Sequence, residues 1–331
     1  MGRNNKLLQR NDKVKILFIT EKWCDGKQEL GLTNSYHNIF GSYVRSDVAK
    51  EHDFFIAHFD ESYLKYNVHI DNIKEKLYNN IKPDLIICTL MGKSVLNPSK
   101  TFFNFFKKKG VKICLMWPDI GHAWGIDQIE QLNDVCDFHV SWAMEENIES
   151  SEKILWLWTP EDPSLFFCGE EEKDIDVSFL GTVHTEERFE CLNFLKNNLS
   201  GAKIHISGGQ RQRGLSHKQY AEITRKSKIV INFPMSPSGF NQLKGRVFES
   251  LASKCLLLEK TNDKTRKYFT PLLDYIEFTD KEELLRLATF YLKNEQQRIK
   301  IAENGYRKFN ELYTNNHFWR RVLNNVGFDN L

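Results

Sequence analysis

Short apolar segments alternate with helical patterns along almost the whole chain, and this alternation restricts the fold more than any other feature. In the first half, strands are predicted at 14–20, 54–59, 84–89, 111–117 and 138–142, with helices at 63–81, 99–109 and 128–134. Strands that are apolar throughout are typical of parallel strands whose two faces are both buried. The pattern therefore predicts an α/β domain with a parallel sheet covered by helices.

A second series of the same kind follows. Its predicted strands are 175–180, 203–207, 228–233, 255–259 and 275–278, and its predicted helices are 186–198, 216–227, 281–293, 294–312 and 316–326. Between the series, residues 156–167 contain two prolines and make a poor helix or central strand. A chain of 331 residues is long enough for about two domains. We therefore place a first Rossmann-like domain at 1–155 and start a second one at residue 156.

Doubly wound sheets bind ligands just beyond the carboxyl ends of their strands. The segment 241–252 lies in such a place, since it opens a helix soon after the strand 228–233. The segment carries Asn241, Lys244, Arg246 and Glu249. Amide groups and cations at a helix start hold phosphates, and a carboxylate accepts hydrogen bonds from sugar hydroxyls. This combination predicts a nucleotide-sugar site. If the helix begins near Leu243, Glu249 lies about two helical turns in, still within reach of a ribose at the edge of the cleft. The alternative is a surface Arg–Glu pair three residues apart.

Two further loops of the second series contribute candidate donor-binding residues. The loop that begins Gly181-Thr182 lets the backbone approach a ligand, and Arg188 follows in the first turn of the next helix. A cation at that position suits a diphosphate, although a helix cap with a solvated arginine fits the pattern too. The basic, glycine-rich loop from Gly208 to 214 is either a nucleotide or acceptor contact or a mobile surface loop.

In the first half, the loop after the strand 111–117 holds two acid/base candidates, Asp119 and His122. Trp117 and Trp124 flank them and would stack on a sugar or base. The competing interpretation is a turn stabilised by the aspartate, with both tryptophans packed between the domains. The long polar and aromatic loop 21–42 is either an acceptor site or a disordered lid.

Composition limits the classes of partner. The formal net charge is +2, from 46 basic and 44 acidic residues, which argues against a general nucleic-acid binder without excluding a local basic patch. No apolar run reaches the roughly 20 residues that span a bilayer, and the polar N-terminus lacks the apolar core of a signal peptide. The seven cysteines are scattered without a CxxC pair. We expect free thiols in a cytoplasmic protein and no metal site.

At this point the chain resembles the GT-B glycosyltransferases, in particular the CgeB-like spore-maturation group with its glycosyltransferase family 1-like C-terminal domain. The stretch 245–259 is similar to the family pattern R-x-F-E-A-x-A-x-G-x-x-L-L. Weaker matches at 179–181, 227–232, 278–284, 291–292, 298–302 and Gly305 extend the resemblance over about residues 156–325. Two positions depart from the pattern: Lys254 replaces a glycine, and Asn241 stands where the retaining E-x7-E group has its first glutamate.

The resemblance implies a GT-B fold with a donor domain at 156–315 and a last helix, 316–331, that crosses back to the first domain. It implies that Glu249 binds the donor ribose, and that basic groups and helix dipoles, without an essential metal, neutralise the departing diphosphate. The expected partners are a nucleotide sugar, which is a co-substrate and not a cofactor, and an acceptor glycan or other hydroxyl compound. If the reaction inverts, Asp119 or His122 is the expected base. If it retains, they orient the acceptor.

Three other functions fit the same residues. A nucleotide-sugar epimerase of the same fold would turn over without an acceptor. A non-catalytic module would bind nucleotide sugar or glycan without turnover. A DNA-modifying glycosyltransferase is allowed by the basic loop at Arg211 and Arg213, although the near-neutral charge of the chain argues against it. The base and sugar of the donor, the stereochemistry and the oligomeric state stay open.

Overall fold

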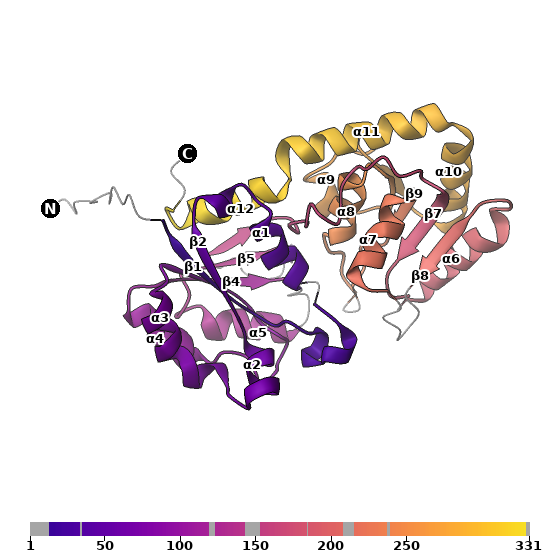
Figure 1. Ribbon diagram of the computed structural model, residues 1–331. Helices are drawn as coiled ribbons and strands as arrows, with labels where there is room; N and C mark the ends of the chain where they lie inside the picture. Colours follow the sequence, from indigo (N-terminus) through magenta and orange to yellow (C-terminus); the bar gives the residue numbers. More distant parts are fainter. Residues whose placement is uncertain are drawn as a thin grey trace.

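The computed structural model describes residues 13–33, 35–118, 123–142, 153–183, 185–207, 215–236 and 239–328. Two α/β units lie side by side in this part of the chain (Figure 1). Within the described residues, the first unit has a six-stranded sheet in the order β2-β1-β3-β4-β5-β6, in which every pairing is parallel. Its strands are β1 (Lys15–Thr20), β2 (Asp53–His58), β3 (Leu85–Thr89), β4 (Lys112–Trp117), β5 (Phe138–Ser141) and β6 (Ile154–Trp156).

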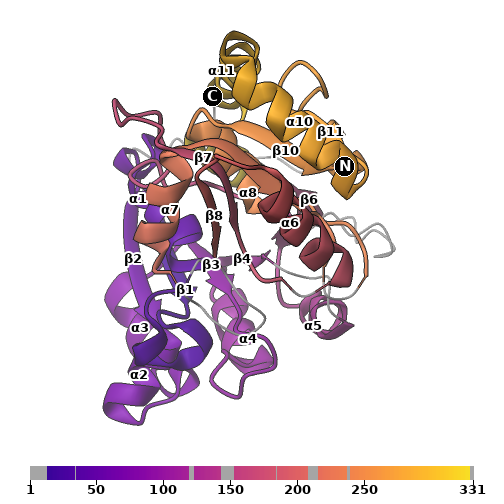
Figure 2. The same ribbon diagram turned by 90° about the vertical axis from the view of Figure 1, so that its right-hand side faces the viewer.

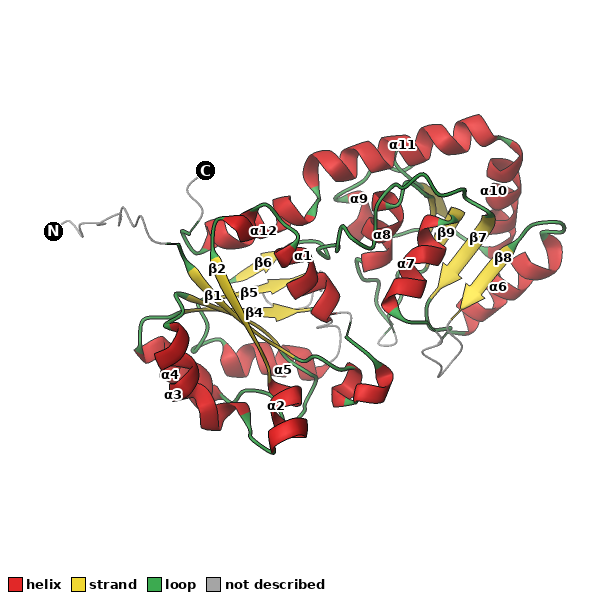
Figure 3. Cartoon of the chain, in the orientation of Figure 1, coloured by secondary structure: helices red, strands yellow, loops and turns green. Residues whose placement is uncertain are grey.

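Helices cover both faces of this sheet (Figure 3). They are α1 (Ser42–Val44), α2 (Phe59–Tyr66), α3 (Lys74–Ile81), α4 (Lys100–Lys108) and α5 (Ala123–Leu132), with a π-helix at Tyr36–Gly41 and 3₁₀ turns at Cys24–Gly26, Gln28–Leu30, Val48–Lys50 and Ile70–Ile73. Along β1, Ile16 and Phe18 enter one core cluster, while Leu17 and Ile19 enter another on the opposite face. Both faces are therefore buried, which explains why the strands are apolar throughout.

The second unit repeats this design with a five-stranded parallel sheet in the order β11-β10-β9-β7-β8. Its strands are β7 (Ile175–Leu180), β8 (Ile204–Ser207), β9 (Ser227–Asn232), β10 (Leu256–Lys260) and β11 (Ile276–Phe278). Its helices are α6 (Glu186–Asn198), α7 (His217–Arg225), α8 (Gly245–Ala252), α9 (Asp263–Arg266), α10 (Lys281–Lys293) and α11 (Glu295–Leu312). The predicted architecture of two doubly wound sheets is confirmed, and Figure 2 shows both from the side.

Two features of the first unit differ from the expectations. The predicted helix 63–81 is broken, because α2 ends at Tyr66 and Asn67 takes a left-handed conformation with φ 51°. A 3₁₀ turn, Ile70–Ile73, then leads into α3. The short strand β6 was not predicted. It pairs with β5 just before the segment that we interpreted as the domain junction.

Two chain crossings connect the units. The first is the segment 157–167, where the Trp158 ring contacts the rings of Phe248 and Phe318. The distance between ring centroids is 6.4 Å to Phe248 of α8 and 6.0 Å to Phe318. The second runs from α11 into α12 (Asn315–Asn325), which lies over the first unit in Figure 1. Trp319 of α12 donates to Ser42 Oγ at 3.0 Å. One apolar core cluster includes residues of both units and both crossings, so the junction is packed rather than a loose linker.

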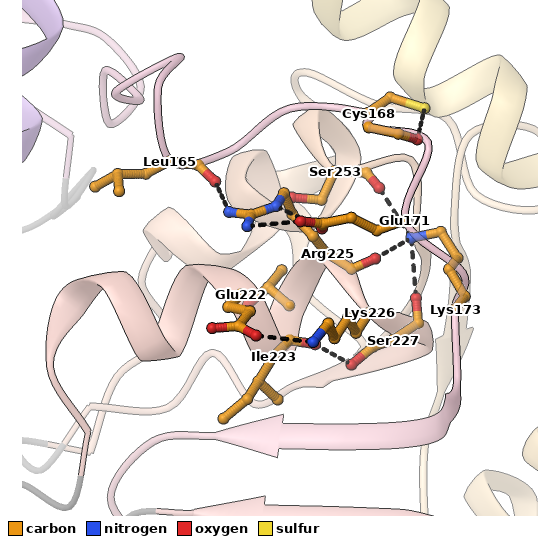
Figure 4. A network of polar contacts seen from close by, with 12 residues as sticks. Leu165, Cys168, Glu171, Lys173, Glu222, Ile223, Arg225, Lys226, Ser227 and Ser253 are labelled. Atoms are coloured by element: carbon orange, nitrogen blue, oxygen red, sulfur yellow. Dashed lines mark hydrogen bonds and ion pairs between the residues drawn. The ribbon is translucent and has the colours of Figure 1, made fainter.

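Past the first crossing, the chain is fastened to the second unit (Figure 4). The Lys173 ammonium donates to the backbone carbonyls of Arg225, Ser227 and Ser253 at 2.8, 3.1 and 3.0 Å. The first and last of these carbonyls lie at the C-terminal ends of α7 and α8, where a cation complements the helix dipole. Arg225 also pairs with Glu171 at 3.0 Å. Hydrogen bonds and an ion pair thus hold the acidic segment 170–174 against α7 and α8 of the second unit.

The end of α8 explains one departure from the family pattern. Lys254, where a glycine is usual, has φ 53°, a left-handed conformation that favours glycine. Its ammonium pairs with Glu303 of α11 at 2.9 Å. The backbone therefore keeps the turn that glycine provides, and the lysine adds a surface ion pair. Among the described residues, no helix is both long and apolar enough to cross a membrane.

Candidate functional site

The start of α8 lies beyond the carboxyl end of β9, as the sequence pattern predicts. The helix begins at Gly245, two residues later than expected, and its N-cap Lys244 is extended with no side-chain cap. Glu249 is therefore one turn into the helix and not two. Because the first N–H groups of a helix have no intrahelical partner, the uncapped end offers donors to an anion.

Arg246 is held in the first turn of this helix by neutral acceptors. Its Nη1 donates to Asn232 Oδ1 at 2.7 Å, at the end of β9, and Nη2 donates to the Leu180 carbonyl at the end of β7. The guanidinium also lies 5.0 Å from the centre of the Phe179 ring. Within the described residues Arg246 has no carboxylate ion-pair partner, and its Nε is buried without a hydrogen bond. Its positive charge is therefore left available to a ligand.

Gly181 has a steric role that the sequence pattern did not reveal. A Cβ at this position would overlap Nη2 of Arg246 and lie 3.3 Å from the Phe179 ring. Gly181 therefore makes the space in which the Arg246 guanidinium lies. Its predicted contact with a ligand stays a prediction.

Arg188 is buried, so the alternative of a solvated arginine is wrong. Its guanidinium donates to the carbonyls of Thr182, Phe233 and Met235 at 2.5, 3.3 and 3.0 Å. Burial, with Arg246 nearby, lowers the pKa of Arg188 to about 10, so it stays charged at neutral pH. Arg188 thus braces the loops after β7 and β9 and adds a second positive charge beside Arg246.

Glu249 is 6% exposed, which excludes the surface Arg–Glu pair as an interpretation. Its Oε2 accepts a hydrogen bond from the Tyr220 hydroxyl at 2.5 Å. Its Oε1 lies near Gly245, at 3.4 Å from a Cβ built on that glycine, and accepts no hydrogen bond from a described residue. Burial raises the pKa of Glu249, while the Tyr220 bond and the Arg246 charge oppose the increase. One carboxylate oxygen is thus fixed and the other is open.

The remaining predicted residues fall into two groups. Asn241 forms an isolated antiparallel bridge with Met235, and the Lys244 ammonium donates to Gln242 Oε1, so both shape the loop before α8. Gly208, Asp119 and His122 lie outside the described residues. Trp117 is too deeply buried to stack on a sugar or base, and it packs inside the first unit and not between the units. It is buried in the first unit, where its Nε1 donates to His139 Nδ1 at 3.0 Å.

The described residues of the loop 21–42 are folded, in contrast to the interpretation of this loop as a disordered lid. Its described residues form 3₁₀ turns and a π-helix. Asp60 anchors the start of the loop by accepting from the backbone N–H groups of Lys22 and Trp23 at 2.8–3.0 Å. At its far end, the His37 ring stacks on His217 of α7, with centroids 4.6 Å apart and planes 14° apart. The first unit thus contacts the second beside the candidate site.

The sequence interpretation missed several residues of the site. Tyr220 and His217 lie on α7, whose helical pattern gave no reason to expect chemistry. Asn232 ends β9 and accepts from Arg246. Its position at a strand end was the available signal.

Two carboxylates in the first crossing were missed as well. Asp162 pairs with Arg45 of the first unit at 3.3 Å. Glu161 is buried with neither oxygen hydrogen-bonded to a described residue. Burial, and then the charges of Glu249 and Asp162, raise the pKa of Glu161 well above its usual range. Burial thus disfavours the ionised form of both carboxyls, and the Tyr220 hydrogen bond and the Arg246 charge oppose this effect at Glu249.

Comparisons with known proteins agree with this geometry. The model of a family described as glycosyl transferase-like matches residues 188–324, from the first turn of α6 to the last turn of α12. HepE of Anabaena, solved in complex with UDP and glucose, has a TM-score of 0.60 at 9% identity and covers 94% of this chain and 100% of its own. Sucrose-phosphate synthase from Thermosynechococcus elongatus gives 0.60 at 10% identity, with 95% and 98% covered.

A glycosyltransferase from Rickettsia africae gives a TM-score of 0.58 at 12% identity, with 95% of this chain and 97% of that chain covered. No curated protein matches the sequence at a significant level. At these identities the structural matches establish the fold and not the activity. The two parallel sheets and the matches over nearly the whole chain define a GT-B fold, and residues 188–324 match the glycosyl transferase-like family model. The predicted fold class is confirmed.

Proposed function

We propose that this protein is a glycosyltransferase that moves a sugar from a nucleotide-diphosphate sugar to an acceptor hydroxyl. One observation carries the proposal: the uncapped start of α8 brings Arg246 and the open oxygen of Glu249 to the strand ends of a GT-B fold. A guanidinium and free N–H groups suit a diphosphate, and a carboxylate suits ribose hydroxyls. HepE, whose structure holds UDP and glucose, supports the proposal by its fold.

In the proposed reaction, the bond between the anomeric carbon and the diphosphate oxygen breaks, and a bond to the acceptor oxygen forms. The electron pair of the broken bond stays on the diphosphate. The proton of the acceptor hydroxyl passes to Asp119 or His122 if the reaction inverts, or to the departing diphosphate oxygen if it retains. Arg246 and the N–H groups of α8 stabilise this negative charge, and the buried Arg188 near Arg246 adds a second positive charge. These groups supply positive charge without a metal ion, so we propose that catalysis is metal-independent and expect turnover to persist in a chelator.

The first unit would supply the acceptor side. We keep Asp119 and His122 as the candidates for a base or for acceptor-orienting groups, because they follow β4 at its carboxyl end. Membership of the CgeB-like group is part of the same proposal and rests on the residue pattern 245–259. Closure of the two units would exclude water and limit hydrolysis of the donor.

The test begins with thermal unfolding of the protein in the presence of UDP, GDP, ADP, CDP and TDP sugars. A ligand present at 100 times its dissociation constant stabilises a fold by about 2.7 kcal/mol, so a donor should be visible as a rise in Tm. Arg246→Ala should abolish most of this rise, whereas Arg286→Ala, which removes an exposed arginine from α10, should not. If none of the donors raises the Tm of the wild-type protein, the proposal fails.

Turnover separates the proposal from its rivals. Release of nucleoside diphosphate that requires an acceptor supports glycosyl transfer. Conversion of the donor without an acceptor would instead indicate an epimerase, and binding without turnover over a broad acceptor panel would indicate a binding module.

A further inference from the structure

Tyr220 has no part in the function proposed so far, although it lies at the centre of the candidate site. It projects from α7 toward α8, where its hydroxyl donates to Glu249 Oε2 at 2.5 Å and also hydrogen-bonds Arg246. Burial and the charge of Glu249 raise the pKa of Tyr220 well above its usual range. The hydroxyl therefore stays protonated, donates to the Glu249 carboxylate and accepts from the Arg246 guanidinium.

The Tyr220 ring is held in this orientation by aromatic neighbours. The His217 ring lies nearly parallel to it, with planes 4° apart and centroids 6.1 Å apart. Phe166, from the first crossing, meets it edge-on at 6.0 Å and 77°. Because these contacts restrict the ring, the hydroxyl fixes Glu249 Oε2 and leaves Oε1 as the open acceptor. A buried carboxylate that is fixed in this way has one direction in which to accept.

We propose that Tyr220 is a positioning residue, which fixes one oxygen of Glu249 and aims the other at a ribose hydroxyl, so that the site prefers ribonucleotides to deoxyribonucleotides. The inference rests on the proposed function, because it assumes that a nucleotide occupies the start of α8. It adds a residue from a different helix, and it assigns to the tyrosine–carboxylate pair a selectivity for the sugar of the nucleotide.

The physical argument concerns the charge state of Glu249. Burial favours the neutral acid, and the hydrogen bond from Tyr220 is the first opposing interaction. The other groups that face Glu249 are Arg246, whose charge also favours the anion, and Glu161, a second buried carboxyl. Without that bond the pKa of Glu249 would rise further, and a larger fraction would be protonated at neutral pH. A hydrogen bond from a ribose hydroxyl to a charged acceptor is stronger than one to a neutral acid. Loss of the Tyr220 hydroxyl should therefore weaken recognition of that ribose hydroxyl, although Tyr220 itself does not contact the nucleotide in this proposal.

The experiment measures Kd by calorimetry for UDP, GDP, ADP and CDP and for their 2′-deoxy and 3′-deoxy forms. For wild-type protein, removal of the recognised hydroxyl should weaken binding about tenfold to a hundredfold. Tyr220→Phe should bind the ribonucleotide more weakly and lose most of this difference between ribo and deoxy forms. Glu249→Gln should lose it as well, whether or not Tyr220 is present.

Tyr275→Phe is the matched control, because it removes another tyrosine hydroxyl that donates to a glutamate, Glu277, at 2.8 Å in the same unit. It should leave the ribo-to-deoxy difference unchanged. A pH series adds a readout that a purely structural role would not move. In Tyr220→Phe, ribonucleotide affinity should recover as pH rises, because Glu249 ionises at higher pH in that variant than in wild type.

The outcomes separate the two proposals. If none of the five donor sugars raises the Tm of wild-type protein, the proposed function fails and this inference fails with it. If a ribonucleotide binds wild-type protein but the deoxy forms bind equally well, only the inference about Tyr220 is overturned. The same holds if Tyr220→Phe retains the full difference at every pH.

Discussion

Acid should loosen the contact between the two units, through the stacked pair of His37 and His217. Burial, with His37 as a second cause, lowers the pKa of His217 to about 3. Its Nε2 is buried and has no hydrogen-bond partner among the described residues, so a proton there would find no acceptor. The surrounding groups are the rings of His37, Tyr220 and Phe166, none of which is anionic. His217 is therefore neutral in the folded protein.

The sign and size of the effect follow from linkage. The pKa of His217 is depressed on folding, from 6.5 to about 3. Above the unfolded pKa, His217 is neutral in both states and does not change the free energy of unfolding. As pH falls below that value, only the unfolded chain takes up the proton, so the folded state loses stability. Between pH 8 and pH 5 the loss from this one group amounts to about 2 kcal/mol. For a cooperative unit of about 150–250 residues, that corresponds to roughly 4–8 °C in Tm.

The assay compares thermal unfolding of wild-type protein and His217→Phe at pH 8, 7, 6 and 5. Phenylalanine keeps an aromatic ring for stacking and removes the titration. Other groups titrate in both proteins, so their contributions cancel in the difference between the two Tm values. That difference should change by about 4–8 °C in favour of the variant as pH falls from 8 to 5. Tm curves that stay parallel over this range would refute the assignment of a buried, neutral His217.

Four further predictions follow from the packing. Glu161→Gln should stabilise the protein more at pH 8 than at pH 5 in chemical unfolding, because a carboxyl with a raised folded pKa loses stability as pH rises above its unfolded value. Lys254→Gly should stabilise by roughly 0.5–1 kcal/mol, since φ is 53° and the pair that it loses is on the surface. Gly305→Ala should destabilise by about 1–3 kcal/mol without changing nucleotide affinity, because its Cβ would overlap the Asp274 carbonyl. Gly181→Ala should instead weaken nucleotide binding, measured by calorimetry, by displacing Arg246.

The fold was predictable because its information is local. Each strand of the sheets carries a continuous apolar run, and each helix between strands carries its own start and stop signals. Thr185 caps α6, and Ser216 with Gln219 forms a capping box on α7. The errors in the predicted elements have two causes: one residue can end a helix inside a favourable pattern, and a strand can be too short to show a pattern. Asn67 ends α2 with a left-handed turn inside an apolar helical periodicity, and β6 is too short for its pattern to identify it.

The site was predictable only in part, because strand-end loops can be located from sequence but contacts between helices cannot. Arg246 and Glu249 lie on one short helix after a strand, so their proximity follows from local geometry. The roles of Arg188 and Trp117 depend on how deeply each side chain is buried, which the local sequence does not reveal. Arg188 is on a helix start, where solvent exposure was expected, yet three carbonyls and two aromatic rings surround its guanidinium.

Tyr220 illustrates the limit most clearly. It is 29 residues from Glu249 in sequence and occupies a helix with a capped start and an ordinary amphipathic pattern. Only the packing of α7 against α8 brings its hydroxyl to the carboxylate, and only the crossing that carries Phe166 closes the other side of its ring. The same ring lies beside His217, which stacks on His37 of the first unit. The residue that orients the open oxygen of Glu249 is therefore in contact with the junction between the units. Because His217 and Tyr220 lie on the same helix, a movement of the units that separates His37 from His217 would leave the contact between His217 and Tyr220 in place and would remove the ring that stacks on His217. The proposed nucleotide site and the arrangement of the two units are therefore linked through His217.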